Sequence, residues 1–286
     1  MIQVELIGGL GNWLFQYAIG RVLAMKHGTR LELNACEHHL RRDSHGLSDV
    51  RMLRCFGIEA GITRIGRLRR RVMDSLLPGE SGRLFRERGW GYDPAVLALG
   101  ASARLFGYFQ SARYWTGHEA QIRAELTPRI SAGHPAPDFL DAIEGANAVS
   151  VHVRRGDYVR SELHDVCTPG YFRRAMAMMR ELVPAPAFFL FSDDPAWSRA
   201  QLAGPDVMQV ELPGSWRRPV LDLALMSRCR HHIISNSTFS WWGAWLDPRP
   251  GKVVLAPERW FNDEAMNRLA MQDTVPSDWR RVPVAG

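Results

Sequence analysis

From residue 148 onward, short apolar runs alternate with longer stretches of helical spacing, and this alternation constrains the fold more than any other feature. We expect strands at 148–153, 187–191, 232–235 and 252–256, and between them helices at 169–182, 220–230 and 240–246. Such alternation favours a parallel sheet covered by helices, in which ligands bind in loops at the carboxyl ends of the strands.

The start of the chain shows the same pattern. Alternating residues at 2–6 predict a strand, the glycine-rich segment 8–12 a loop, the apolar stripe at 14–25 a helix, and 30–34 a second strand. This order predicts a βαβ unit.

A turn-forming stretch at 131–138 contains two prolines and is typical of a domain boundary. Between about 35 and 135 the sequence does not order the elements. We therefore predict an N-terminal α/β domain at 1–135 and a C-terminal α/β domain at 136–286.

Composition excludes several classes of protein. Hydrophobic residues make up 46% and charged residues 23%, as in globular rather than disordered chains, and no apolar run approaches the roughly 18 residues that span a bilayer. The strand-like start lacks the features of a signal peptide, so we expect a cytoplasmic protein. The four cysteines have no paired spacing, which favours reduced thiols over a metal site or disulfides.

A formal charge of +6 favours an anionic partner, without distinguishing nucleic acid, a phosphorylated small molecule and a membrane surface. The basic residues lack the interleaved aromatic side chains of a strand-binding groove, so we expect no nucleic-acid partner. One row of arginines is typical of a solvated helix face, with peripheral contact at the inner face of the plasma membrane as the alternative. This row consists of Arg64, Arg67, Arg69, Arg70 and Arg71.

The sharpest candidate site is the segment 152–158, His-Val-Arg-Arg-Gly-Asp-Tyr, at the carboxyl end of a predicted strand. The planar fork of arginine can hold phosphate oxygens bidentately, and Gly156 lets the backbone turn closely around a ligand. Arg154 and Arg155 therefore favour a diphosphate site. The alternative is a surface loop in which the arginines pair with Asp157, with Arg155 as its expected partner.

Two other predicted strands also end in polar residues. Asp193 and Asp194 could accept hydrogen bonds from a guanine or from sugar hydroxyls, whereas the alternative is that Ser192 or Asp193 caps the next helix. After the strand at 232–235, the amides of a helix start could bind an anion together with Ser237, Thr238 and Ser240.

The opening glycine loop could bring backbone amides against a phosphate or a sugar. A dinucleotide-binding oxidoreductase, with Glu32 about 20 residues after this loop, is an alternative function. Leu14 stands where the third glycine of that fingerprint would lie, which argues against it. A non-catalytic carbohydrate- or nucleic-acid-binding protein, suggested by the ten tryptophans, is a further alternative; Trp241 and Trp245, one helical turn apart, are expected to pack in the core instead.

Four segments in this order resemble the alpha-1,2-fucosyltransferases of glycosyltransferase family 11. They are Gly-Gly-Leu-Gly-Asn at 8–12, His-Val-Arg-Arg-Gly-Asp-Tyr at 152–158, Phe-Ser-Asp-Asp at 191–194 and Ser-Asn-Ser-Thr-Phe-Ser-Trp-Trp-Gly-Ala-Trp-Leu at 235–246. Segments 107–111, 225–229 and 256–261 also look like blocks of this family. The chain departs from the family pattern at Trp13, where the family usually has glutamine.

The resemblance implies a GT-B-like α/β fold, with two Rossmann-like domains facing across a cleft, and a metal-independent inverting transfer. It implies that the N-terminal domain, 1–135, is on the acceptor side and that the C-terminal domain, 136–286, binds the GDP-sugar. It implies that Arg154 and Arg155 stabilise charge on the leaving GDP, while Asp157 is a candidate general base by position. GDP-fucose is expected to be the donor, and no metal or other cofactor is expected. The implied donor-binding residues are Gly9, Gly11, Asn12, His152, Arg154, Asp193, Asp194, Asn236, Ser237 and Thr238.

The expected reaction moves L-fucose from GDP-fucose to the 2-hydroxyl of a terminal galactose. The acceptor is expected to be an oligosaccharide or a lipid-linked glycan in bacterial surface polysaccharide synthesis. Another GDP-sugar or another linkage on the same fold is the alternative.

Overall fold

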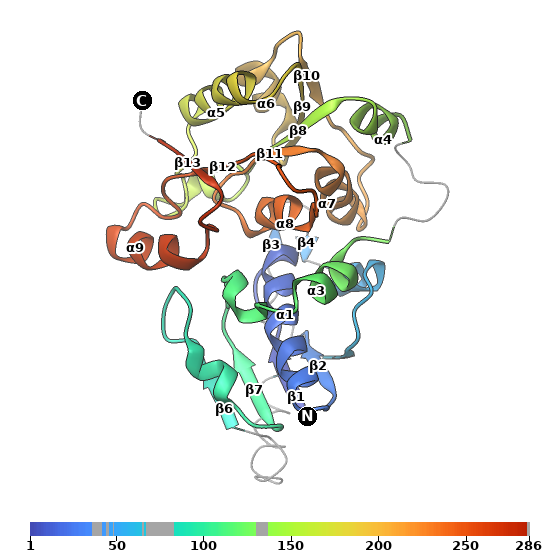
Figure 1. The fold of residues 1–286 in the computed structure, drawn as a ribbon, viewed down its shortest axis with the longest axis vertical. Coiled ribbons are helices and arrows are strands. Elements are labelled where there is room, and N and C mark those ends of the chain that lie inside the picture. Colours follow the sequence, from blue (N-terminus) through green and yellow to red (C-terminus); the bar gives the residue numbers. More distant parts are fainter. Residues whose placement is uncertain are drawn as a thin grey trace. The chain divides into compact units, whose positions relative to one another are not determined.

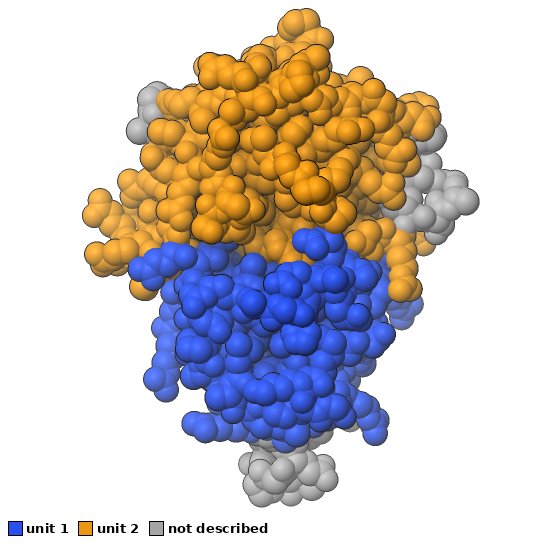
Figure 2. All heavy atoms as spheres, viewed as in Figure 1, with its two compact units in different colours: residues 1–126, 272–274 blue, residues 127–271, 275–286 orange. Residues whose placement is uncertain are grey.

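The computed structural model describes residues 1–35, 42–43, 46–47, 49–64, 66, 83–129 and 137–284. The chain divides into two compact units (Figure 2): unit 1 comprises residues 1–126 and 272–274, and unit 2 comprises residues 127–271 and 275–286. The stretch predicted to separate two domains lies, up to residue 136, outside the described residues. The same holds for the arginine row beyond Arg64.

Unit 1 contains a five-stranded parallel sheet with the order β5-β2-β1-β7-β6. Its strands are β1 (Ile2–Glu5), β2 (Leu31–Asn34), β5 (Gly61–Thr63), β6 (Arg83–Arg86) and β7 (Ala103–Phe106). Helix α1 (Leu10–Lys26) joins β1 to β2, which confirms the predicted βαβ unit. Gly20 permits close packing of α1 on the sheet, because a Cβ there would lie 2.6 Å from the Val4 side chain and 2.8 Å from that of Leu31.

Short elements complete unit 1. They are the antiparallel pair β3 (Arg42–Asp43) and β4 (Gly46–Leu47), the 3-10 helices η1 (Val50–Cys55), η2 (Pro94–Ala98) and η3 (Ala112–Trp115), and helix α3 (Glu119–Leu126).

Unit 2 contains a six-stranded parallel sheet with the order β10-β9-β8-β11-β12-β13, which confirms the predicted parallel sheet. Its strands are β8 (Asn147–Val153), β9 (Pro186–Ser192), β10 (Val207–Gln209), β11 (His231–Ile233), β12 (Val254–Pro257) and β13 (Arg280–Val282). Counted along the chain, the order is 3-2-1-4-5-6, that of a Rossmann sheet. The order reverses between β8 and β11, and such a reversal is where ligands bind.

Helices cover both faces of this sheet. They are α4 (Pro137–Glu144), α5 (Pro169–Leu182), α6 (Pro195–Leu202), α7 (Arg218–Arg228), α8 (Thr238–Leu246) and α9 (Glu264–Asp273), with the 3-10 turn η4 (Tyr158–Arg160). No helix within the described ranges is long and apolar enough to cross a membrane. Trp241 and Trp245 are buried in α8 with their rings stacked at 6.0 Å, so the predicted core role of this pair is confirmed.

Successive residues of β8 face opposite layers of unit 2. Val149, Val151 and Val153 belong to the core that contains residues of α5 and α6. Ser150 and His152 point to the other face, where His152 lies 5.4 Å from the Phe239 ring of α8. Figure 1 shows α5 and α6 on one side of the sheet and α7 and α8 on the other. The alternating side chains of β8 therefore point into an apolar layer on one face of the sheet and toward polar groups on the other.

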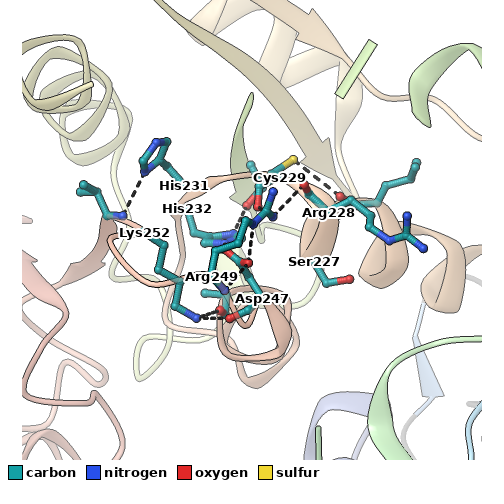
Figure 3. Close-up of polar contacts among 12 residues, drawn as sticks. Ser227, Arg228, Cys229, His231, His232, Asp247, Arg249 and Lys252 are labelled. Carbon is teal, nitrogen blue, oxygen red and sulfur yellow. Dashed lines mark hydrogen bonds and ion pairs between the residues drawn. The ribbon is translucent and has the colours of Figure 1, made fainter. Parts of the chain in front are cut away.

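A buried polar network lies near the amino end of β11 (Figure 3). His232 Nδ1 lies 2.8 Å from Ser150 Oγ, and His232 Nε2 lies 3.2 Å from Asp247 Oδ2. Arg249 Nε donates to the other carboxylate oxygen of Asp247 at 2.7 Å. Although burial opposes its ionisation, hydrogen bonds from His232 and Arg249 keep the pKa of Asp247 below its ordinary value. Because Ser150, His232 and Asp247 are all buried, this network ties β8, β11 and α8 together and offers no access to a substrate.

This network predicts a pH dependence of stability. Burial lowers the pKa of His232 to about 4, and it also lowers that of His152 to about 4, whereas the ordinary value is 6.5. Between these values each histidine binds more protons in the unfolded chain than in the folded chain, so its contribution to the free energy of unfolding falls as the pH drops from 6.5 toward 4. Asp222 and Glu87 act in the opposite direction, because burial raises the pKa of each to about 7. The contribution of a histidine is therefore measured as the difference between its variant and the wild type.

His232→Gln should raise the urea midpoint at pH 5 relative to that at pH 7, compared with the wild type, since it removes one of the two buried imidazoles. His118→Gln, at a half-exposed position of unit 1, is the matched control and should keep the slope of the wild type. Equal slopes for His232→Gln and the wild type would show that His232 does not titrate as described.

Candidate functional site

Three loops meet at the carboxyl edge of the unit 2 sheet, because β8 lies between β9 and β11. They follow Val153 of β8, Ser192 of β9 and Ile233 of β11, and they carry most of the predicted site residues. Val153 pairs directly with Ser192, so the arginines that follow one strand meet the aspartates that follow the other.

Arg154 is held by two carboxylates. Its Nη2 donates to Asp157 Oδ1 at 2.7 Å, and its Nη1 lies 2.7 Å from Asp193 Oδ2. Asp157, for which the sequence suggested Arg155 as a partner, thus pairs with Arg154, because the 3-10 turn after Asp157 brings this carboxylate back to Arg154. The side chain of Asp157 is 49% exposed and that of Arg154 is 20% exposed. An incoming anion can therefore displace the exposed Asp157 carboxylate and bind the Arg154 guanidinium in its place.

Arg155 lies on the other side of the loop. Its Nε donates to Asp194 Oδ2 at 3.3 Å, and its guanidinium lies 4.0 Å from the centroid of the Trp197 ring. Asp194 caps helix α6, since its Oδ1 accepts from the Trp197 amide at 3.1 Å. The helix cap is thus Asp194, whereas the sequence suggested Ser192 or Asp193.

Asp193 instead contacts the loop at 154–157, which follows β8 and is called the arginine loop below. Its Oδ1 accepts from the Arg155 amide at 2.8 Å while its Oδ2 faces Arg154. Gly156 makes this contact possible, because a Cβ at that position would lie 2.7 Å from Asp193 Oδ2. The carboxylate therefore fixes both the backbone and one guanidinium of the loop.

His152 lies beneath this loop and is 6% exposed. Its Nδ1 lies 3.1 Å from Ser235 Oγ, a partner that the sequence did not indicate. Burial is the main cause that lowers the pKa of His152, with Arg154 adding to the effect and Asp193 opposing it. The imidazole is therefore neutral at pH 7 and adds hydrogen-bonding groups but no charge.

The loop after β11 supplies a helix start. Ser237 caps α8, its Oγ accepting from the Phe239 amide at 3.3 Å, and Thr238 is half-buried. Asn236 is 2% exposed, and its Nδ2 donates to the carbonyls of His164 and Trp260, both at 3.0 Å. The Asn236 side chain is therefore engaged within the fold, and its place here is to hold the loop.

The structure places Gly9, Gly11 and Asn12 in unit 1, with Gly9 at the end of the loop after β1 and Gly11 and Asn12 in the first turn of α1. Gly9 is the N-cap residue of α1, with no side-chain cap. Trp13 is fully buried, and its Nε1 donates to the Gly8 carbonyl at 3.0 Å. Trp13, which departs from the pattern of the family, is therefore part of the core and holds the loop after β1 in place.

The sequence reasoning also missed Asp222 on α7. Arg218, four residues earlier, lies 3.6 Å away, and this spacing on one helix face is the signal that could have found the pair. Burial raises the pKa of Asp222 to about 7 although Arg218 opposes the effect. Among the described residues, no group of three or more His, Cys, Asp or Glu side chains is placed to hold a metal ion.

Comparison with known proteins adds evidence from beyond the chain. The Glycosyl transferase family 11 model matches residues 95–282. Alpha-1,2-colitosyltransferase of Escherichia coli is 30% identical over 295 residues, covering 99% of each chain. O-antigen biosynthesis glycosyltransferase WbnK of Escherichia coli is 32% identical and covers 60% of this chain and 59% of that protein. Galactoside 2-alpha-L-fucosyltransferase SEC1 of Bos taurus is 33% identical and covers 51% and 43%, respectively.

One solved structure supports the architecture. A family 9 glycosyl transferase from Veillonella parvula superimposes with a TM-score of 0.51, at 10% identity, and covers 100% of this chain and 87% of that one. Together with the two parallel sheets, this likeness confirms the predicted GT-B-like α/β fold class.

Proposed function

Because the chain belongs to glycosyl transferase family 11, we propose that it transfers L-fucose from GDP-fucose to the 2-hydroxyl of a terminal galactose on a glycan. The observation that carries the proposal is the arginine pair at the carboxyl edge of a Rossmann-ordered sheet, beside the point where the strand order reverses. A nucleotide diphosphate is the ligand class that suits such an edge and such side chains.

The main requirement of this reaction is that the negative charge on the leaving diphosphate is stabilised. As the acceptor hydroxyl attacks C1 of the sugar, the bond to the diphosphate breaks and negative charge develops on the departing phosphate. The Arg154 guanidinium exchanges Asp157 for this phosphate and keeps its contact with Asp193, which holds it in place. In many enzymes, preorganised charge of this kind contributes more to the rate enhancement than any other single effect.

A general base must take the proton of the acceptor hydroxyl. Asp157 is our candidate, because its carboxylate is half exposed and is released when Arg154 turns to the diphosphate. His152, Asp193 and Asp194 would seat the nucleotide, and Ser237 and Thr238 would complete the phosphate site at the start of α8. The arginines supply the charge that a metal ion would otherwise provide, so the transfer is expected to be metal-independent.

A second donor is favoured by a specific observation. A relative that covers nearly the whole chain is named a colitosyltransferase, and colitose is L-fucose without its 3-hydroxyl group. A site that hydrogen-bonds this hydroxyl would reject colitose strongly, whereas an apolar site there would accept either sugar. Competition between GDP-fucose and GDP-colitose for transfer separates the two functions.

The relatives also support a setting for the reaction. One is an O-antigen biosynthesis glycosyltransferase and another a galactoside fucosyltransferase, so we propose a galactose-terminated, lipid-linked or free glycan as acceptor in surface polysaccharide synthesis. Synthesis of this kind would place the enzyme in the cytoplasm, with peripheral contact at the inner membrane face.

The test is incubation with GDP-fucose and a panel of galactosides in the presence of EDTA, with the linkage of the product read by NMR. We expect an alpha-1,2-fucosylated galactoside at a rate that EDTA does not change. Hydrolysis of the donor without any glycoside product would overturn the proposal. Loss of activity with EDTA that is restored by a divalent cation would overturn metal independence alone.

A further inference from the structure

A cavity in unit 1 is lined mainly by arginines, none of which belongs to the arginine loop of unit 2. Its volume is about 250 Å³, and its lining comes from the 3-10 helix η1 and from strand β5 with the residue that follows it. Among the described residues, the lining consists of Val50, Arg51, Arg54, Ile62 and Arg64. Two separate segments of the chain thus bring three guanidiniums to one space.

The sequence of η1 explains why two of these arginines lie on the same side. Val50, Met52 and Leu53 are buried, whereas Arg51 and Arg54 are exposed. In a 3-10 helix, residues three positions apart lie directly above one another. Burial of the apolar residues therefore leaves both guanidiniums on the exposed side of η1, beside the cavity.

Arg64 reaches the cavity from the other segment. It directly follows β5, in which Thr63 pairs with Asn34 of the parallel neighbour β2. The Ala35 amide donates to the Thr63 carbonyl at 2.8 Å, so the ladder continues to the last residue of β5. Arg64 therefore lies at the carboxyl edge of the unit 1 sheet, the edge at which open α/β sheets bind ligands.

Positive charge exceeds negative charge around the cavity. Arg51 Nε donates to Asp49 Oδ2 at 2.7 Å; this hydrogen bond lowers the pKa of Asp49 against the effect of burial, and the charge of Arg64 lowers it further. Within the described part of the chain, neither Arg54 nor Arg64 forms an ion pair within 4.0 Å. A concave surface with charge of one sign concentrates counter-ions, and guanidiniums hold phosphate oxygens bidentately.

The lining also offers apolar surface. The Ile62 side chain is 40% exposed although it lies on the same cavity as the guanidiniums. A ligand that matches both features has a phosphate group at the end of an apolar chain. Lipid phosphates have this chemistry, and clusters of arginines in basic pockets are a known way of binding them.

We propose that Arg51, Arg54 and Arg64 bind the phosphate group of a lipid. The proposal rests on the proposed function, because it names the residues that make the contact with the inner membrane face. Arg54 and Arg64 attract the phosphate, Arg51 is positioned by Asp49, and Ile62 contacts the first carbons of the lipid chain. A lipid phosphate has two sources at a membrane, an anionic phospholipid and a lipid-linked glycan, and the two arms of the test distinguish them.

The first arm is co-sedimentation of the full chain with phosphatidylcholine vesicles, with and without phosphatidic acid. We expect binding to the vesicles that contain phosphatidic acid if a phospholipid is the source. The double variant Arg54→Gln and Arg64→Gln should lower the apparent affinity by about tenfold or more, because it removes two of the three positive charges at the cavity.

The second arm is calorimetric binding of geranyl diphosphate to the enzyme saturated with GDP, so that the donor site is already filled. We expect binding here if a lipid-linked glycan is the source, because such glycans carry their sugar on a prenyl diphosphate. The same double variant should raise the Kd by about tenfold or more.

The matched control is the double variant Arg30→Gln and Arg83→Gln. It removes the same charge from exposed positions at the amino ends of β2 and β6, on the opposite edge of the same sheet. It should bind each probe as the wild type does. Thermal unfolding of both double variants checks that the fold is kept.

Three results would overturn the site: wild-type enzyme that binds neither probe, a cavity variant that binds as the wild type does, and a control variant that loses as much affinity as the cavity variant. Neither arm needs turnover, so the proposal and the proposed function fail separately. Binding that only the cavity variant loses supports the site even if no fucose is transferred. Sugar transfer with unchanged binding supports the function and contradicts the site.

Discussion

Replacing Arg154 by lysine is expected to lower kcat for sugar transfer by about 10²- to 10³-fold, and to raise the Kd for GDP by a smaller factor. A lysine keeps the positive charge but has one ammonium group, so it cannot hold Asp193 and a phosphate oxygen with two separate nitrogens as the guanidinium does. The loss of one preorganised group that stabilises transition-state charge costs about this much in other enzymes. The measurement is steady-state transfer at saturating GDP-fucose and galactoside, beside calorimetric binding of GDP.

Arg180→Lys is the matched control. Arg180 also binds an aspartate through two nitrogens, at 2.8 and 3.0 Å, but it lies near the end of α5, beside Phe188 of β9 and Asp206 before β10, and not in the loops at the carboxyl edge. Its replacement should leave kcat within twofold. A kcat of Arg154→Lys close to that of Arg180→Lys would remove Arg154 from the reaction.

Gly156→Ala is expected to lower kcat/KM by about 10²-fold. The added Cβ would lie 2.7 Å from Asp193 Oδ2, so this carboxylate must move away from both Arg154 and the Arg155 amide. Displacement of a positioned catalytic group by about 1 Å is enough for such a loss. The measurement is kcat/KM for GDP-fucose at saturating acceptor, together with the urea midpoint.

Gly100→Ala is the matched control, and it tests whether replacing any glycine by alanine lowers kcat/KM. No heavy atom lies within 4 Å of a Cβ at Gly100, which is exposed in unit 1. We expect wild-type kinetics for this variant. Wild-type kinetics for Gly156→Ala as well would mean that the contact between Gly156 and Asp193 does not position the arginines.

Elements with strong local signals could be predicted from the sequence. The helix at 169–182 has the predicted bounds, because Thr168 caps it and Pro169 fixes its first turn. Helix α7 begins at Arg218 rather than at residue 220, since Pro219 belongs to its first turn, and β11 ends at Ile233 rather than at Ser235. The strands β6 and β7 were not predicted; Arg83–Arg86 is largely exposed and lacks the apolar alternation of a half-buried strand.

The residues of the candidate site could be predicted from the sequence, but which of them contact one another could not. The sequence places arginines and aspartates at the ends of two strands, but it does not contain the register that sets Val153 opposite Ser192. Because of this register, Asp193 meets the arginine loop and Asp194 is left to cap α6. The pairing of Gln110 with Asn12 spans 98 residues and depends on the order of strands in unit 1, which no local pattern encodes.

If the guanidiniums of the arginine loop receive the diphosphate of the leaving group, a crystal structure of the GDP complex will show that contact. We expect a nitrogen of Arg154 or Arg155 within about 3 Å of a β-phosphate oxygen, with Asp157 released from Arg154. A complex in which the diphosphate binds while Arg154 remains on Asp157 and Asp193, and Arg155 on Asp194, would contradict it.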